Sequence, residues 1–211
     1  MGVPQLPTVD ERRAAILDTA LAMFAERGFH GTSVPDVIAG ARVGSSTLYR
    51  LYPSKEALVN AVFVMAKERL ERAISVDLDR VQQPHALFHD LWLRLVRFSR
   101  DEPLAFHFLE LQDHTAYLTA QSRGVELRVL GPIFAACSEF QAMGVFTRDV
   151  APEVILAFVW GALIGLVKAE RTAYLKLSDK SYESACESAW RAFAATEKRA
   201  PNTKRDGNSK R

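Results

Sequence analysis

Apolar residues recur every three or four positions along most of this 211-residue chain, and they rarely alternate with polar residues. Spacings of three and four place side chains on one face of an α-helix, whereas alternation is typical of half-buried β-strands. The pattern therefore predicts an all-α protein. One apolar stripe near the N-terminus consists of Ile16, Leu17, Ala20, Leu21 and Phe24.

Side chains that can cap or end a helix divide the first third of the chain into four predicted helices. Thr8 and Glu11 have the spacing of a capping box and begin the first helix, which Gly28 is expected to end. Ser33 and Ser54 can accept bonds from the free N–H groups of the second and fourth helices. These helices are expected at about residues 9–27, 34–41, 45–51 and 55–75.

The remainder of the chain is predicted to form longer helices, several of them begun by proline, which is tolerated in a first helical turn. They are expected at about residues 84–100, 103–114, 120–143, 152–174 and 178–198. The last residues, 200–211, have a basic and polar composition, so we expect them to be disordered.

Composition excludes several classes of protein. Two cysteines are too few for a disulfide scaffold or a four-cysteine zinc site, and the histidines show no metal-ligand spacing, so no metal or other cofactor is expected. The start of the chain resembles no secretory signal. The longest apolar run, residues 154–167, is shorter than the ~20 residues of a membrane span. We therefore expect a soluble, cytoplasmic protein that contacts no membrane.

The formal net charge of +2 is unevenly distributed. Residues 73–197 carry a net charge of −4, whereas residues 198–211 carry +5. A nucleic-acid-binding protein usually presents a basic face or stripe, and the charge of the whole chain does not indicate one. Any argument for nucleic-acid binding must therefore come from a motif.

Such a motif lies at residues 31–58, GTSVPDVIAGARVGSSTLYRLYPSKEAL. Two short helices joined by a tight turn and braced by longer helices form a helix-turn-helix. Hydroxyl side chains and an arginine on the second short helix can reach phosphates and base edges, and neighbouring tyrosines and a lysine can hold phosphates. The candidate DNA-contacting residues are Thr32, Ser33, Ser45, Ser46, Thr47, Tyr49, Arg50, Tyr52 and Lys55.

The order TLYRLYPSKEAL, preceded by GTSVPDV, resembles the DNA-binding domain of the TetR/AcrR family of bacterial transcriptional regulators over about residues 10–65. The resemblance implies an all-helical homodimer, with an N-terminal three-helix DNA-binding domain and a larger ligand-sensing domain. The resemblance also implies contacts with the DNA backbone, or support for such contacts, from Thr32, Tyr49, Tyr52 and Lys55. It implies a position at the DNA groove for Ser45, Ser46, Thr47 and Arg50.

The expected organisation follows from this resemblance and from the predicted helices. It consists of a helix-turn-helix domain over residues 8–54, a connecting helix over 55–75, a ligand-binding and dimerisation domain over 76–198, and a disordered basic tail over 199–211.

Three positions near the turn depart from the usual pattern of that family. Arg42 stands where glycine is usual, and a positive φ there would cost about 1 kcal/mol unless Gly40 or Gly44 takes up the bend. Ile38 stands where alanine is common. Gly44 occupies a usual Ser or Thr cap position, so the cap is expected to pass to Ser45. These departures leave the pose of the second short helix open.

The predicted helix at 152–174 contains two glycines, Gly161 and Gly165, in a G-x-x-x-G step. Small residues let helices approach closely. Ala185 and Ala189 offer small residues on the last helix, so these four residues are expected at a dimer interface.

The middle of the chain, residues 83–141, carries eight of the twenty aromatic residues and four of the five histidines. Ligand pockets are mostly apolar with a few orienting polar groups, so we expect a small lipophilic effector there. The candidate ligand-binding residues are Phe88, Trp92, Phe106, His107, Glu110, His114 and Phe134.

Two classes of function remain open. The first is a transcriptional regulator, a repressor released from a palindromic DNA operator by a small molecule. The second is an α-helical enzyme or ligand carrier that contains a helix-turn-helix. An enzyme should show clustered polar residues in the middle helices, where they are sparse, and no P-loop, dinucleotide-binding or G-x-S-x-G pattern is present. We therefore expect a regulator and not an enzyme.

Overall fold

The computed structural model describes residues 8–75 and 82–195. These residues form nine α-helices and, apart from one isolated bridge between Phe146 and Ala194, no β-structure, which confirms the all-α prediction. The helices are α1 (Val9–Gly31), α2 (Val34–Ala41), α3 (Ser45–Leu51), α4 (Lys55–Ile74), α5 (Pro84–Asp101), α6 (Pro103–Glu110), α7 (Ala120–Ala142), α8 (Pro152–Arg171) and α9 (Asp179–Phe193).

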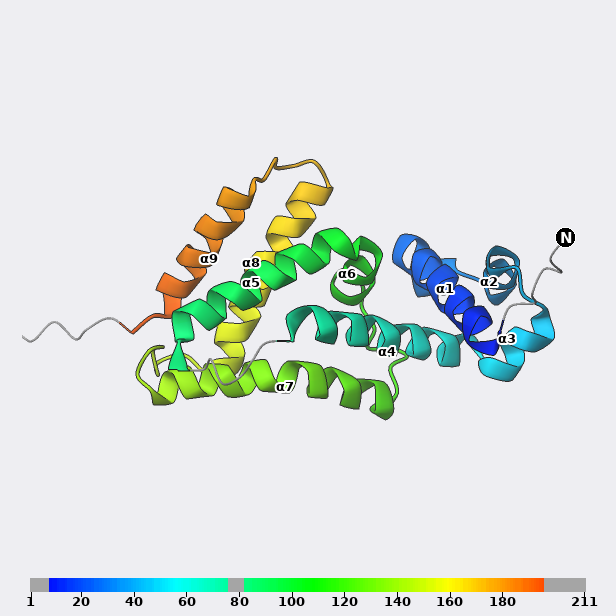
Figure 1. The fold of residues 1–211 in the computed structure, drawn as a ribbon, viewed down its shortest axis with the longest axis horizontal. Helices are drawn as coiled ribbons and strands as arrows, with labels where there is room; N and C mark the ends of the chain where they lie inside the picture. Colours follow the sequence, from blue (N-terminus) through cyan, green and yellow to red (C-terminus); the bar gives the residue numbers. More distant parts are fainter. Residues whose placement is uncertain (1–7, 76–81, 196–211) are drawn as a thin grey trace, which may run out of the picture.

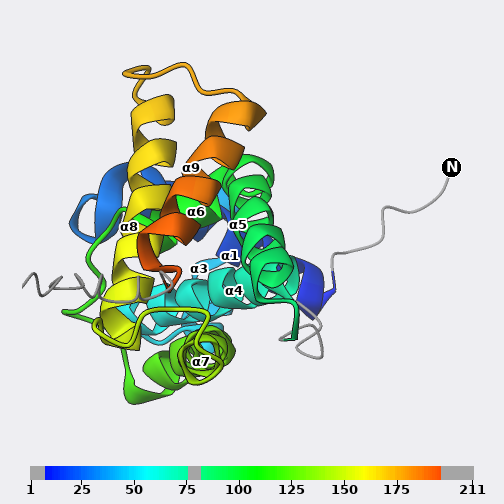
Figure 2. The same cartoon turned by 90° about the vertical axis from the view of Figure 1, so that its left-hand side faces the viewer.

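Figure 1 shows α1, α2 and α3 grouped at one end of an elongated molecule. The long helix α4 runs from this group into a larger domain, where it packs against α5, α6 and α7. Helices α8 and α9 stand side by side in both views (Figures 1 and 2) and contact α5. The molecule therefore has a small N-terminal helical domain and a larger C-terminal one, joined by α4.

The helix starts follow the capping residues found in the sequence. Thr8 and Glu11 form a reciprocal capping box at the start of α1. The Ser33 side chain accepts a hydrogen bond from the Asp36 backbone N–H at 3.2 Å, and Ser54 caps α4 in the same way. These bonds satisfy N–H groups that have no partner within their own helix.

Some helix ends differ from the expectation. Helix α6 ends at Glu110 rather than near His114, because the Asp113 carboxylate accepts a bond from the Thr115 backbone N–H at 2.8 Å and so favours a turn. Helix α8 ends at Arg171, and Ala173 follows with a φ of 57°. Helix α9 ends at Phe193 rather than near residue 198.

Buried side chains of α1, α4, α5 and α6 belong to one continuous apolar cluster, and α1 packs on both α4 and α6. A second, smaller cluster lies at the far end of the molecule around Phe140 and Phe146. The small domain and the larger domain therefore share a core across α4 and α6. The predicted tail at residues 199–211 lies outside the described residues.

Candidate functional site

The turn between α2 and α3 has a backbone conformation that glycine normally adopts. Arg42 has φ 54° and ψ 41°, in the left-handed region, whereas Gly44 is extended with a φ of −73°. Gly44 is the residue that caps α3, and it has no side chain to do so. The expected transfer of the cap to Ser45 is therefore wrong, because Ser45 is already the first helical residue.

Gly40 has a packing role rather than a turning role. A Cβ atom built on Gly40 would lie 2.8 Å from Thr19 Cγ2 and 3.0 Å from Met23 Cε. Since α1 and α2 approach this closely, only glycine fits without a shift of the two side chains. Ile38 is half-buried and packs against the main core cluster, so its larger side chain is accommodated.

Helix α3 presents one polar face to solvent. Ser45, Ser46, Tyr49 and Arg50 are exposed, Tyr49 by 48% despite its aromatic ring. Leu48 faces inward and is fully buried, so it fixes the orientation of the short helix. Ser33 is exposed at the start of α2, and Thr47 is half-buried. The structure thus places seven of the nine candidate DNA-contacting residues, Lys55 among them, where solvent reaches them in full or in part.

Thr32 and Tyr52 are buried instead. The Thr32 hydroxyl donates towards the carbonyls of Gly28 (2.9 Å) and Met23 (3.1 Å), and so holds the bend at the end of α1. The Tyr52 hydroxyl accepts a bond from Arg13 Nε at 3.4 Å, which raises the pKa of the Arg13 guanidinium. Thr32 thus holds the end of α1 before α2, and Tyr52 holds the end of α3 against α1.

Lys55 lies at the start of α4, with its Nζ 4.3 Å from the centre of the Phe29 ring. The Phe29 ring stacks in turn on Tyr117, with ring centres 4.5 Å apart. The lysine is half-buried along its stem, so its charge is positioned at the edge of the small domain. The ammonium group is therefore held beside the Phe29 ring at the start of α4.

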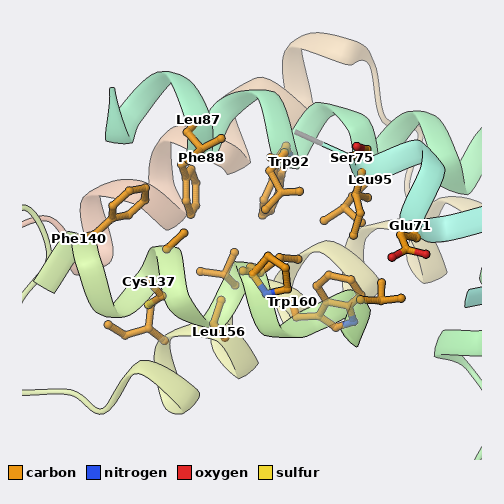
Figure 3. Close-up of a pocket in the computed structure, with 18 of the residues that line it drawn as sticks. Glu71, Ser75, Leu87, Phe88, Trp92, Leu95, Cys137, Phe140, Leu156 and Trp160 are labelled. Atoms are coloured by element: carbon orange, nitrogen blue, oxygen red, sulfur yellow. The ribbon is translucent and has the colours of Figure 1, made fainter. Parts of the chain in front are cut away.

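A cavity of about 280 Å³ lies inside the larger domain. Figure 3 shows side chains of α5 and α7 facing each other across it, with α8 contributing Leu156 and Trp160. The wall is largely apolar and aromatic, as is typical of small-molecule sites. Its residues on α5 include Leu87, Phe88, Leu91, Trp92 and Leu95, and those on α7 include Val129, Ile133, Cys137 and Phe140.

Few polar groups reach this cavity. Arg128 Nη1 donates to both carboxylate oxygens of Glu71, at 2.6 and 2.8 Å, so the two charges in the wall form a pair. Burial raises the pKa of the Cys137 thiol to about 11, which keeps it neutral at pH 7. Trp92 Nε1 is buried, and no described residue accepts a hydrogen bond from it.

Two of the seven predicted ligand-binding residues, Phe88 and Trp92, line this cavity. The other five lie outside its wall. Phe106 is buried in the main core cluster, His107 is half-buried, and Phe134 is on the partly exposed side of α7. The apolar residues that α8 contributes were not foreseen. These residues recur every three to four positions along one face of α8, and this spacing could have predicted that α8 contributes to the cavity wall.

Glu110 and His114 belong to a polar network beside the cavity. Trp160, which is part of the wall, donates its Nε1–H to the Glu110 carboxylate at 2.6 Å. Burial raises the pKa of Glu110, opposed by the charge of Lys67 and by this bond. The His114 ring bonds to the Phe108 carbonyl (2.5 Å) and the Tyr117 hydroxyl (2.7 Å), and burial lowers its pKa.

Helix α8 has a second, solvent-facing side that is also apolar. Val154 and Phe158 are each 56% exposed, and Gly161 and Gly165 continue the same face. Among the described helices, α8 alone is long and apolar enough to cross a membrane by length and composition, and 17% of its apolar window is buried. Core helices of soluble proteins pass the same test. Of the predicted interface residues on α9, Ala185 is half-buried and Ala189 lies in the core of the same chain.

The short helices α2 and α3, with a polar face on α3, define a helix-turn-helix DNA-binding protein whose second domain holds an apolar cavity. Comparison with family models gives the same result. The model described as "Bacterial regulatory proteins, tetR family" matches residues 16–62, and that described as "Tetracyclin repressor-like, C-terminal domain" matches residues 63–195. The chain belongs to the TetR family. It is a DNA-binding transcriptional regulator and not an enzyme, so the alternative of a helical enzyme is excluded.

Individual relatives agree with this assignment. The HTH-type transcriptional repressor KstR2 of Mycobacterium tuberculosis (strain CDC 1551 / Oshkosh) is 46% identical over 52 residues, which cover 25% of this chain and 26% of that protein. The repressor DhaR of Mycobacterium sp. (strain GP1) is 26% identical over 75% of this chain and 83% of its own. The higher identity is thus confined to about a quarter of the length of KstR2.

A TetR family transcription regulator from Marinobacter aquaeolei VT8 has the same fold, with a TM-score of 0.78, 24% identity, and coverage of 89% of this chain and 97% of its own. The fold is therefore shared over nearly the whole of both chains.

Proposed function

We propose that this protein is a repressor that binds a two-fold symmetric DNA site as a homodimer and is released from it by a small apolar effector in the cavity. The observation that carries the proposal is the pairing of an exposed polar α3 with an apolar cavity in the same chain. A cytoplasmic location follows from this function, since the operator is there.

The proposed DNA contacts divide by kind. Arg50, Ser45 and Ser46 are exposed on α3 and can reach base edges in the major groove. Tyr49 and Lys55 flank them and are suited to phosphates. Thr32 and Tyr52 are buried, so we assign them a supporting role, in which they fix the position of α2 and α3.

The proposed dimer interface is the exposed apolar face of α8. A Cβ atom on Gly161 or Gly165 would meet nothing within 4 Å in the chain itself, so the fold of one protomer does not require glycine there. Close approach by the same helix of a second copy would require it. An exposed apolar face of this kind is typical of an interface, and a two-fold dimer buries it on both copies.

Helix α6 offers a route from the cavity to the DNA-binding domain. On one side its Glu110 accepts the bond from Trp160 in the cavity wall. Two residues after the end of α6, Gln112 Nε2 donates to the carbonyls of Phe24 (2.6 Å) and Ala25 (3.0 Å) in α1. A ligand that moves Trp160 can thus change the position of α1, and with it the spacing of the two α3 helices.

Selection of bound DNA from a random duplex pool tests the DNA-binding part of the proposal. We expect a two-fold symmetric motif. Arg50→Ala should lose preference at one position in each half-site, at a cost of about 1–3 kcal/mol. Lys55→Ala is the matched control, because it should weaken binding to all sequences alike and lower the salt slope by about one. A motif unchanged by Arg50→Ala, or no enriched motif, would contradict the assignment.

A further inference from the structure

Trp92 in α5 is the cavity residue with an unsatisfied polar atom. It is 2% exposed, and its Nε1 has no hydrogen-bond partner in the part of the chain that the structure describes. The other indole of the wall, Trp160, is already paired with Glu110. Buried N–H groups are nearly always bonded, so an unpaired donor in a cavity wall points to an acceptor that comes from outside the chain.

The rest of the wall offers no uncompensated charge. Glu71 and Arg128 are the ionised residues that line the cavity, and they bond to each other. An ionic ligand would have to be desolvated without a counter-charge, or would have to break this pair. The wall therefore favours an uncharged ligand.

The polar and apolar parts of the wall are separated. In Figure 3, Glu71 and Ser75 lie at one end of the cavity, Phe88 and Phe140 lie at the other, and Trp92 lies between them. The volume of about 280 Å³ falls just below the ~300–1,000 Å³ of most small-molecule sites. These dimensions suit a compact ligand whose apolar end faces the aromatic side chains.

We propose that the effector is a small, uncharged and largely apolar molecule whose one essential polar feature is a hydrogen-bond acceptor, of the carbonyl or ether type, held by the Trp92 Nε1–H. This inference rests on the proposed role of the cavity as the effector site. A ligand that lacks an acceptor would leave the indole N–H unpaired, whereas a ligand that carries one gains this hydrogen bond.

Two matched probes test the inference. 4-Phenylcyclohexanone carries one acceptor on an apolar frame, and phenylcyclohexane has the same frame without it. We expect the ketone to bind the full-length protein about tenfold more tightly, the order of one net hydrogen bond. In a ¹H–¹⁵N spectrum of the folded protein, the three tryptophans give three indole signals, and the ketone should move the Trp92 signal downfield relative to its position with the hydrocarbon.

Two variants identify the donor. Trp92→Phe keeps an aromatic ring but removes the N–H, so it should lose its indole signal and bind the two probes with equal affinity. Trp190→Phe removes the one indole that lies outside the cavity wall, and should keep the tenfold preference. In the wild-type protein, a downfield shift of one indole signal with the ketone and not with the hydrocarbon is expected without any variant, so a folding defect in Trp92→Phe does not remove the test.

Equal affinity of the wild-type protein for both probes, or a Trp92 signal at the same position with both, would overturn the inference. Failure of the ketone to bind would also overturn it. DNA binding is measured separately. If the ketone binds through Trp92 and the DNA complex stays intact at saturation, the proposed release mechanism is contradicted while the Trp92 assignment stands.

Discussion

Arg42 adopts a left-handed backbone conformation that costs an L-residue about 1 kcal/mol. Neither nearby glycine relieves it, since Gly44 is extended and Gly40 serves the contact between α1 and α2. The packing of α2 and α3 therefore sets the turn between them, and the backbone of Arg42 adopts the left-handed conformation that this turn requires.

Replacing Arg42 by glycine should therefore stabilise the protein. We expect a gain of up to about 1 kcal/mol, reduced in part by the greater freedom of glycine in the unfolded chain. For a chain of this length this corresponds to a rise of roughly 2–4 °C in the melting temperature, measured by calorimetry. Arg42→Ala keeps the strained conformation and is the control. A glycine variant no more stable than the alanine variant would contradict the account.

His114 gives the folded protein a defined pH dependence. Burial lowers its pKa from 6.5, and both ring nitrogens of the neutral ring have partners. Because the pKa of His114 is lower in the folded protein, the unfolded chain binds a proton more readily. The stabilising contribution of neutral His114 is therefore present above about pH 6.5 and is lost as the pH falls below that value. His114→Gln should lose less stability than the wild type between pH 7.5 and pH 5.5 in denaturant unfolding. The exposed His30→Gln should behave as the wild type, and equal pH dependence in all three proteins would contradict the assignment.

At the scale of the helices, α8 has two apolar faces with different neighbours. One face lines the cavity and the other is exposed with Gly161 and Gly165 on it. Gly161→Leu should leave the protomer folded, because the new side chain enters open space, and should block the approach of a second copy.

Sedimentation should then show monomers, and DNA affinity should fall with the loss of the dimer. Gly124→Leu in α7, where a Cβ also meets nothing within 4 Å, is the matched control and should remain dimeric. A dimeric Gly161→Leu variant, or a monomer with full DNA affinity, would rule out this interface.

Gln112 joins the end of α6 to α1 through two carbonyl groups. Gln112→Met keeps a similar volume and removes both bonds. We expect the DNA affinity without effector to change little. The coupling free energy between effector and DNA binding should fall by about 0.5–2 kcal/mol. Binding is measured by anisotropy of labelled DNA with and without a saturating effector found by thermal-shift screening. Gln121→Met, on the exposed start of α7, is the control, and equal effector responses in both variants would exclude this route.

Across the whole molecule, the sequence predicted the features that depend on residues close together along the chain, such as helix starts. Thr8, Ser33 and Ser54 cap their helices as expected, and α3 spans the predicted residues. The end of α6 was misjudged because the turn at Asp113 competes with helical periodicity.

The cavity was predicted only in outline, because its wall depends on which helices meet. Phe88 and Trp92 are part of it, but the contribution of α8 requires the position of that helix against α5 and α7. The burial of Tyr52 likewise depends on the contact of the end of α3 with Arg13 of α1, 39 residues earlier, which no local pattern encodes.

In the proposed complex, one α3 helix from each of two copies reads one DNA site. The direct measurement is the number of chains bound to a selected duplex, by native mass spectrometry, together with the affinity after about five base pairs are inserted between the half-sites. That insertion rotates one half-site by about half a helical turn. We predict two chains, or a multiple of two, per duplex and loss of specific binding after the insertion. One chain per duplex, or an affinity unaffected by the insertion, would contradict the account.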